Sequence, residues 1–366
     1  MLSSNYFGTI DYIFMGLYVL VLIFLGFYLK KLASRSLDNY ICGGKNIPWW
    51  AMGISGMASF LDLAGTAVIV SFLFLLGPQG LFVEFRGGAV LVLPFMMLWT
   101  GKWHRRSGCL TGAQWNIYRF GDCWGGRASQ FMGVVATVLT TIGMLAYLII
   151  GAGIFLSTFL PYSPEACSLT LLVMATLYTM MSGFYGVIFT DLFQACNILV
   201  AVIYISVKAF TGIGDAGEIS EIAATVTGNP DWISSIPKWN VHMPEGYEVY
   251  KHLLIFASFY LVRTIVAGLG TGADPRYFGA KTDRECAKLS MLWTVLMTVR
   301  WPMMIGIAVM GLYLVNDLLP DQTKLKEAAA LIHEANPETE KPQWGALISS
   351  ISNAPEEQDP ALVASL

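Results

Sequence analysis

Long apolar runs, separated by short segments rich in glycine and charge, dominate the first 315 residues of the chain. A helix needs about 20 mostly apolar residues to cross the hydrocarbon core of a bilayer. The pattern therefore predicts eight membrane-spanning segments, and the longer ones have room to tilt or to break. The predicted segments are 10–29, 47–76, 82–101, 130–160, 167–184, 187–210, 253–272 and 289–315.

Composition strengthens the membrane assignment. Hydrophobic residues make up 55% of the chain and charged residues 13%, whereas globular domains hold about 45–50% and about 25%. We therefore expect a lipid bilayer around the chain. The first apolar run lacks a preceding basic stretch and a small-residue cleavage site, which predicts a retained helix rather than a signal peptide. The net charge of −3 lies mostly in predicted outer loops and indicates no nucleic-acid partner.

Basic residues are concentrated in the loops after the first, third and seventh segments, which hold thirteen of the 22 Lys and Arg residues. Eight crossings place these three loops on one side of the membrane, and basic loops face the cytoplasm. We therefore predict a multi-pass protein of the cell membrane with its amino terminus outside. The basic residues are Lys30, Lys31, Arg35, Lys45, Lys102, Arg105, Arg106, Arg119, Arg127, Arg276, Lys281, Arg284 and Lys288.

The segment 47–76 carries an aspartate, Asp62, at its centre, within the sequence GMASFLDLAGTAV. The small residues around it favour close helix packing, but packing does not explain a carboxylate at that depth. We predict that the helix breaks between residues 58 and 65, because irregular backbone at membrane depth is tolerated where it lines a cavity. Freed carbonyls beside a carboxylate suit a small cation such as Na⁺. A purely structural hydrogen-bonding role for Asp62 is the alternative.

A second break is predicted in the segment 253–272, where Gly268, Gly270 and Gly272 precede Asp274. Interrupted helices at corresponding places in two halves of a chain indicate a transporter binding site. The two breaks lie five segments apart, which predicts a first repeat over 47–210 and a second repeat that begins at residue 250. Helix packing through spaced glycines produces similar patterns and remains the alternative.

Three further charges fall within apolar segments: Asp191, Arg263 and Arg300. Such residues normally face a partner, a cavity or a pathway. For Asp191 the alternative is a carboxylate in the first turn of a helix, where the helix dipole favours it. Arg263 could meet a solute carboxylate or pair with another helix. For Arg300, structural pairing and a functional contact are both open.

Four motifs resemble the sodium:solute symporter family, which has a LeuT-like fold. NYICGGKNIPWW at 39–50 is similar to the entry of the family's first repeat, and RFG at 119–121 to the end of the loop before its fourth helix. SGFYGVIFTDLFQ at 182–194 resembles its Ser-Gly turn and Thr-Asp-x-x-Gln helix start. DPRYFGAKTDRECAK at 274–288 resembles its Gln-Arg-aromatic loop. The resemblance extends over about residues 10 to 315.

The resemblance implies an all-α membrane fold of two inverted five-helix repeats preceded by one extra helix. It also implies Na⁺-coupled symport by alternating access, without enzymatic activity and with no cofactor besides the coupling ion. The Ala-Ser-x-Leu run gives the carbonyls of Ala58 and Leu61 to the Na⁺ site. Asp62 matches an aspartate of the proline-transporting branch, and Asp191 matches a position on the cytoplasmic Na⁺ exit. Candidate solute-binding residues are Ser59, Gly65, Thr66, Arg263 and Gly270.

The solute expected from this resemblance is a small organic molecule. An amino acid such as proline, a sugar or a carboxylate are all compatible with it. Nothing in the sequence resembles a phosphate-binding loop, and the six cysteines do not have the spacing of metal ligands.

The transmembrane domain is predicted to span 1–315. A polar outer segment, 316–366, then contains a short helix, KLKEAAALIHEA. The second repeat would have two of its five helices, without the paired Ser/Thr residues that complete the family's Na⁺ site. We therefore expect a chain ending here to be a fragment that does not transport by itself. A sensory domain of a longer signalling protein is the main alternative, and a structural subunit or a channel is another.

Overall fold

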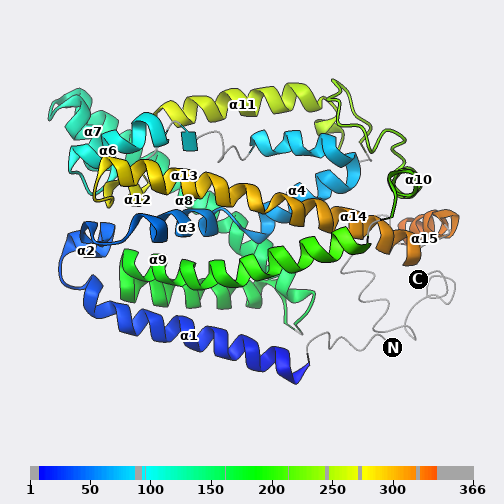
Figure 1. The fold of residues 1–366 in the computed structure, drawn as a ribbon, viewed down its shortest axis with the longest axis horizontal. Coiled ribbons are helices and arrows are strands. Elements are labelled where there is room, and N and C mark those ends of the chain that lie inside the picture. Colours follow the sequence, from blue (N-terminus) through cyan, green and yellow to red (C-terminus); the bar gives the residue numbers. More distant parts are fainter. Residues whose placement is uncertain are drawn as a thin grey trace. The chain divides into compact units, whose positions relative to one another are not determined.

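The structure, a computed structural model, describes residues 8–86, 93–94, 96–160, 162–212, 214–243, 247–270, 274–318 and 322–335. All regular elements within these ranges are helical (Figure 1). The long helices are α1 (Thr9–Ala33), α3 (Trp49–Ser59), α4 (Leu63–Leu76), α8 (Trp124–Ser157), α9 (Pro164–Gly212), α11 (Leu253–Gly270), α13 (Asp283–Val299) and α14 (Trp301–Leu318). The shorter ones are α2 (Leu37–Cys42), η1 (Gly43–Lys45), η2 (Gly77–Arg86), η3 (Met96–Thr100), α6 (Gly101–Ser107), α7 (Gly112–Phe120), α10 (Ala216–Thr227), η4 (Glu248–Tyr250), α12 (Pro275–Phe278) and α15 (Gln322–Ala335).

The chain divides into two compact units. The first contains residues 1–212 and 234–308, and the second contains residues 213–233 and 309–366. All candidate site residues belong to the first unit.

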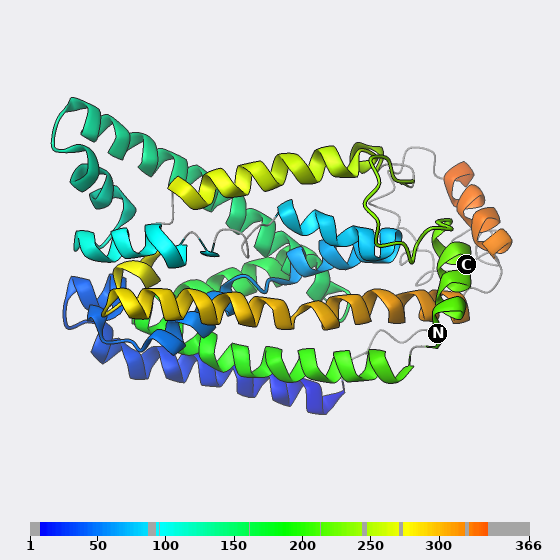
Figure 2. The same ribbon diagram turned by 45° about the horizontal axis from the view of Figure 1, so that its top comes forward.

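A row of four helices organises the first unit: α3 lies between α13 and α9, and α1 packs on α9 (Figures 1 and 2). Glycines on α3 allow this close approach. A Cβ atom on Gly53 would lie 3.0 Å from the carbonyl oxygen of Leu289, and one on Gly56 would overlap the indole ring of Trp293. Small residues at the interface thus bring the backbone of α3 against α13, as is typical of helix packing in membranes.

The predicted break in segment 47–76 is confirmed, since α3 ends at Ser59 and α4 begins at Leu63. The predicted boundary between segments 167–184 and 187–210 is also present. The backbone leaves helical geometry at Gly183 (φ 51°, ψ −145°) within α9. A side chain is disfavoured at this positive φ, and a Cβ there would also meet Tyr40. At 1.5 Å per residue, the 49 residues of an unbroken α9 would far exceed the thickness of a bilayer.

The other predicted segments have different outcomes. Segments 10–29, 130–160 and 253–272 correspond to α1, α8 and α11. Segment 289–315 corresponds to the pair α13 and α14. The segment 82–101 is only partly described, because residues 87–92 and 95 lie outside the described ranges. The second break, predicted around Gly268, Gly270 and Gly272, is not found as far as Gly270, because α11 stays helical to that residue. Residues 271–273, with Gly272, lie outside the described ranges.

Five helices among the described residues are long and apolar enough to span a membrane: Thr9–Ala33, Leu63–Phe82, Trp124–Ser157, Pro164–Gly212 and Asp283–Leu318. The regular structure of the described residues is thus all helical, and the chain is a multi-pass membrane protein. The predicted total of eight crossings and the two-repeat layout stay predictions.

The second unit contains α10, the end of α14, and α15. The backbone N–H of Gly214 donates to the phenol oxygen of Tyr313 at 3.0 Å. Ala223 of α10 and Ile332 of α15 are buried. The helix predicted from KLKEAAALIHEA is confirmed as α15, whereas residues 336–366 lie outside the described ranges.

Candidate functional site

The α3–α4 break is the first element of the site. Phe60 caps the carboxyl end of α3, and the chain then passes through Leu61 and Asp62 without regular structure. Asp62 has extended backbone geometry (φ −86°, ψ 153°) as the N-cap of α4. The break therefore brings a helix carboxyl end and a helix amino end together, within an apolar segment long enough to cross a bilayer.

The side chain of Asp62 lies at the amino end of α4. Its carboxylate accepts the backbone N–H of Gly65, and the hydroxyl of Thr66 donates to the Asp62 carbonyl at 2.7 Å. An N-cap carboxylate satisfies a free N–H and offsets the positive end of the helix dipole. Asp62 thus has the structural role that the sequence left as its alternative, and this role does not exclude an ion-binding one.

Two carbonyl groups of the break accept hydrogen bonds, one from backbone N–H groups and one from an arginine side chain. The Ala58 oxygen accepts the N–H of Leu61 at 3.2 Å. The Phe60 oxygen accepts from Nη1 of Arg300, also at 3.2 Å. The Ala58 oxygen also accepts the N–H of Phe60, so a cation bound there would share this oxygen with backbone donors.

A polar cluster lies directly before the break, in which Ser55 and Arg276 are buried and Ser59 is exposed. We call it the Asp191 cluster; its members are Ser55 and Ser59 of α3, Asp191 of α9, Asp274, and Arg276 of α12. Ser55 donates to Asp191, and the Ser59 hydroxyl lies 3.5 Å from the same carboxylate oxygen. The Ser59 hydroxyl also donates to the Ser55 carbonyl at 2.9 Å.

Arg276 holds the Asp191 cluster together. Its Nη2 donates to the hydroxyls of Ser55 and Ser59, each at 2.7 Å, and lies 3.5 Å from the Asp191 carboxylate. Its Nη1 pairs with Asp274 at 3.0 Å. The side chains of Arg276 and Asp191 are only 8% and 13% exposed, so the charges interact in a weakly screened environment. With both carboxylates ionised, two negative charges face one positive charge, and the cluster can stabilise an additional cation.

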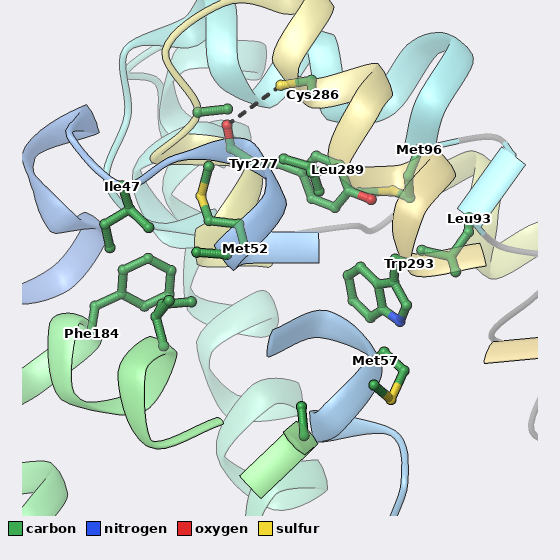
Figure 3. Packing of buried hydrophobic residues seen from close by; sticks show 14 of the residues in the cluster. Ile47, Met52, Met57, Leu93, Met96, Phe184, Tyr277, Cys286, Leu289 and Trp293 are labelled. Carbon is green, nitrogen blue, oxygen red and sulfur yellow. Dashed lines mark hydrogen bonds between the residues drawn. The ribbon is translucent and has the colours of Figure 1, made fainter. Parts of the chain in front are cut away.

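Aromatic packing fixes the position of Arg276. Its guanidinium carbon lies 5.5 Å from the centre of the Trp293 ring. The neighbouring Tyr277 is buried, and its hydroxyl hydrogen bonds to Ser290 at 2.7 Å. Burial raises the pKa of Tyr277 above its ordinary value, so the phenol stays protonated. Figure 3 shows Tyr277 and Trp293 in one apolar cluster with Met52 and other side chains of the helices that meet here.

The structure brings the predicted site residues together in two groups. Asp62, Gly65 and Thr66 meet at the start of α4, and Ser59 meets Asp191 beside the end of α3. Ala58 and Leu61 lie in the chain between these groups.

The two candidates on α11 lie apart from these groups in their described contacts. Arg263 is exposed, with its guanidinium 5.9 Å from the ring of Tyr260. Gly270 is the last residue of α11, and residues 271–273 that follow it lie outside the described ranges. Their proposed contact with solute stays a prediction.

Sequence reasoning missed three members of the Asp191 cluster. Asp274 was noted only as the residue that follows a glycine-rich stretch. Arg276 was counted only as a basic loop residue, and Ser55 was not singled out. One signal for Ser55 was present, because it precedes Ser59 by four residues and so lies on the same helix face. Arg276 had no comparable local signal, since its partners Ser55 and Asp191 are 221 and 85 residues away in the chain.

Comparison with known proteins gives relatives of one kind. The sodium/sialic acid symporter NanT of Aliivibrio fischeri is 26% identical over 212 residues, which are 56% of this chain and 39% of that protein. The sodium/glucose cotransporter 4 of Mus musculus is 24% identical over 248 residues, covering 64% of this chain and 33% of that protein. The human sodium/myo-inositol cotransporter is 24% identical, and the match covers 64% of this chain and 32% of that protein. The chain thus spans about a third to two-fifths of the length of these relatives.

A solved structure supports the fold. A Na⁺-coupled sialic acid symporter in a substrate-bound, outward-open state matches with a TM-score of 0.68 and 20% identity, over 86% of this chain and 62% of that one. The model of the sodium:solute symporter family matches residues 40–335, which are most of the chain. The members of this family are transporters rather than enzymes. On this evidence the chain belongs to the sodium:solute symporter family.

Proposed function

We propose that this chain forms the ion-binding and solute-binding part of a Na⁺-coupled symporter, which moves a small organic solute across the cell membrane by alternating access. The observation that carries the proposal is the α3–α4 break, where carbonyl groups of a helix end lie next to Asp62. Broken helices of this kind bind coupling ions and solutes near the middle of the membrane. Membership of a sodium:solute symporter family supports this proposal.

The proposed Na⁺ ligands are the carbonyl oxygens of Ala58 and Leu61 together with Asp62. Hard oxygen ligands suit a small, weakly polarisable cation. Asp62 would contribute mainly charge, because one of its oxygens accepts the Gly65 N–H. Because these ligands lie along the break, a bound ion would favour a state in which the end of α3 and the start of α4 remain close together.

The Asp191 cluster is the proposed closure on the cytoplasmic side. It joins α3 to α9 and α12 through buried charges and hydroxyls. Opening this side would require these hydrogen bonds to break, and Asp191 would then lie on the Na⁺ exit path. This orientation rests on the distribution of basic loops, which also predicts an amino terminus on the outside.

The proposed solute is small and polar and binds near Ser59, Gly65 and Thr66, with Gly270 and Arg263 as candidates from α11. The names of the relatives include sialic acid, glucose and myo-inositol. A sugar, a sugar acid or another carboxylate is therefore favoured as a starting point for screening, and amino acids such as proline belong in the same screen.

The D62N substitution tests the ion site and separates it from the capping role. Asparagine is as good an N-cap as aspartate, so D62N should leave the melting temperature without Na⁺ nearly unchanged. Loss of the charge should raise the Na⁺ concentration for half-maximal stabilisation at least about tenfold, which corresponds to about 1.4 kcal/mol.

The measurement is thermal unfolding of the purified chain in lipid nanodiscs, with NaCl exchanged against choline chloride at constant ionic strength. D122N is the matched control, because Asp122 is exposed and pairs with Arg127 outside the break. Because the family's paired Ser/Thr ligands are not expected within this chain, the response should need a higher Na⁺ concentration than a complete site would. An unchanged Na⁺ midpoint for D62N, or no specific response of the unmodified chain even at high Na⁺, would contradict the proposal.

A further inference from the structure

Trp293 lies within α13 and is only 3% exposed. Its indole nitrogen, Nε1, is buried and has no hydrogen-bond partner among the residues that the structure describes. At 1.5 Å per residue, Trp293 is roughly 15 Å from the start of α13 at Asp283, which is about half the thickness of a bilayer core. A buried donor without an acceptor destabilises a fold, and each such exception in a native protein calls for an explanation.

Three contacts fix the position of the Trp293 ring. A Cβ atom on Gly56 would overlap the atoms where the two rings of the indole join, so this glycine makes room for the side chain. The ring centre of Phe60 lies 5.3 Å from that of Trp293, and the guanidinium carbon of Arg276 lies 5.5 Å from it. These contacts engage the carbon atoms and the π-system of the indole. The N–H is the polar group of the side chain, and none of these contacts uses it.

Trp293 lies where the α3–α4 break meets the Asp191 cluster. Phe60 caps the carboxyl end of α3 at the break, and Arg276 belongs to the Asp191 cluster. In Figure 3 the indole nitrogen is on the edge of the ring that faces Met57, in the last turn of α3. The unused N–H therefore lies between the proposed solute site and the proposed closure on the cytoplasmic side.

A trapped water molecule is the alternative acceptor for this N–H. Such a water needs about two to four polar partners, whereas the cluster of side chains that contains Trp293 is hydrophobic. The hydroxyl of Tyr277 in the same cluster is already paired with Ser290. An oxygen atom of a solute is held by the rest of its molecule and needs no second partner here. A solute oxygen therefore explains the unused donor better than a water does.

Resting on the proposed function, we propose that the indole N–H of Trp293 donates a hydrogen bond to an oxygen atom of the solute on the cytoplasmic side of the α3–α4 break. An indole is uncharged and only donates, so it selects for an acceptor oxygen rather than for a charge. The solute class is one that carries a hydroxyl, carbonyl or carboxylate oxygen at this position. A solute without that oxygen leaves the N–H unpaired and binds more weakly.

The test replaces Trp293 with 3-benzothienylalanine, which keeps the shape of the indole but has sulfur in place of the N–H. The matched control is the same replacement at Trp124, which is 86% exposed at the start of α8. The probes are glucose, glucuronate, myo-inositol, sialic acid and proline. Thermal unfolding in lipid nanodiscs at a constant, high NaCl concentration gives the probe concentration for half-maximal stabilisation of each protein.

At least one probe should stabilise the unmodified chain, and the replacement at Trp293 should raise its midpoint about fivefold or more, as expected for one lost hydrogen bond. The control should leave the midpoint unchanged. Without probe, the melting temperature should stay the same or rise, because the replacement removes a donor that has no partner. A purely structural Trp293 predicts a lower melting temperature with an unchanged probe midpoint. That result, or a panel in which no probe binds, would overturn the proposal.

Oxygen-deleted analogues of the binding probe identify the acceptor. One deletion should weaken binding to the unmodified chain by a similar factor, and should have no effect on the variant at Trp293. Equal losses in both proteins for every analogue would contradict the contact. If the benzothienyl variant does not fold, W293F takes its place, with W124F as its control, and the same comparison of analogues applies.

Ultraviolet resonance Raman spectroscopy tests the water alternative without any probe. The difference between the spectra of the unmodified chain and the benzothienyl variant isolates the signal of Trp293. Its N–H should show no hydrogen bond until a probe is added. An N–H that is already hydrogen bonded in the probe-free chain would assign the donor to a water and overturn the proposal.

The outcomes separate this proposal from the proposed function. The Na⁺ response of the unmodified chain and its weakening in D62N test the ion site alone. If both are observed, but the replacement at Trp293 leaves every probe midpoint unchanged, only the role of Trp293 is overturned. If Na⁺ has no specific effect on the unmodified chain, the proposed function fails, and the inference that rests on it fails as well.

Discussion

Replacing Arg276 with glutamine should open the Asp191 cluster, the proposed closure between α3, α9 and α12. Besides its contact with Trp293, the guanidinium has four described polar partners: Ser55, Ser59, Asp274 and Asp191. Removing one partner of a buried ion pair costs about 3–5 kcal/mol, because the other charge stays buried without compensation. Asp191 is 13% exposed, so the lower end of that range applies. A change of about 3 kcal/mol increases the population of the open state roughly a hundredfold.

Cys286 provides the assay for this opening. It is fully buried. Its thiol lies 4.0 Å from the carbonyl oxygen of Tyr277 (Figure 3), the residue that follows Arg276 in the chain. With the other five cysteines replaced by serine, the rate of alkylation by N-ethylmaleimide reports how often this region opens. R276Q should raise that rate by one to two orders of magnitude, and Na⁺ should partly reverse the increase.

R127Q is the matched control for R276Q. It removes the same type of side chain from an ion pair with Asp122 in which both partners are more than 60% exposed, and exposed pairs contribute about 0–1 kcal/mol. Its Cys286 should therefore react at the unmodified rate. If Cys286 reacts equally slowly in R276Q and R127Q, the Asp191 cluster does not hold this side closed.

Two glycine substitutions test the packing that positions the site, each against a glycine with open space around it. G56A should lower the free energy of unfolding by about 1–3 kcal/mol, because the added methyl group overlaps Trp293. G143A has no atom within 4 Å of its Cβ and should be neutral or slightly stabilising in the same thermal melt. G183A should also destabilise by about 1–3 kcal/mol, because its φ of +51° disfavours any side chain; G212A, also open, is its control. Equal melting temperatures within either pair would contradict the packing described here.

The break in α3–α4 could be predicted because the sequence contains a conflict that a regular helix cannot resolve. A carboxylate and several small residues interrupt an apolar run at the depth where charge is most costly. The boundary at Gly183 could also be predicted, because the apolar sequence there is too long for one membrane crossing and was divided into two segments, 167–184 and 187–210. Both predictions depend on residues close together in the chain.

The Asp191 cluster could not be derived in this way. Asp191 and Arg276 are 85 residues apart in the chain. Ser55 lies a further 136 residues before Asp191. In the sequence, Arg276 stands beside Asp274 in a polar loop, where a solvated charge is the ordinary expectation. Only the packing of α3 against both α9 and α13 converts that loop charge into a buried one. Arg300 illustrates an intermediate case: its depth marked it as unusual, but only the fold shows that it reaches the break.

The two charges at the break have opposite signs and lie at the helix ends that each one complements. Arg300 donates to the carbonyl end of α3, and Asp62 accepts from the amide end of α4. Both ends of the broken helix are therefore stabilised by the chain itself, which lowers the cost of irregular backbone in an apolar setting.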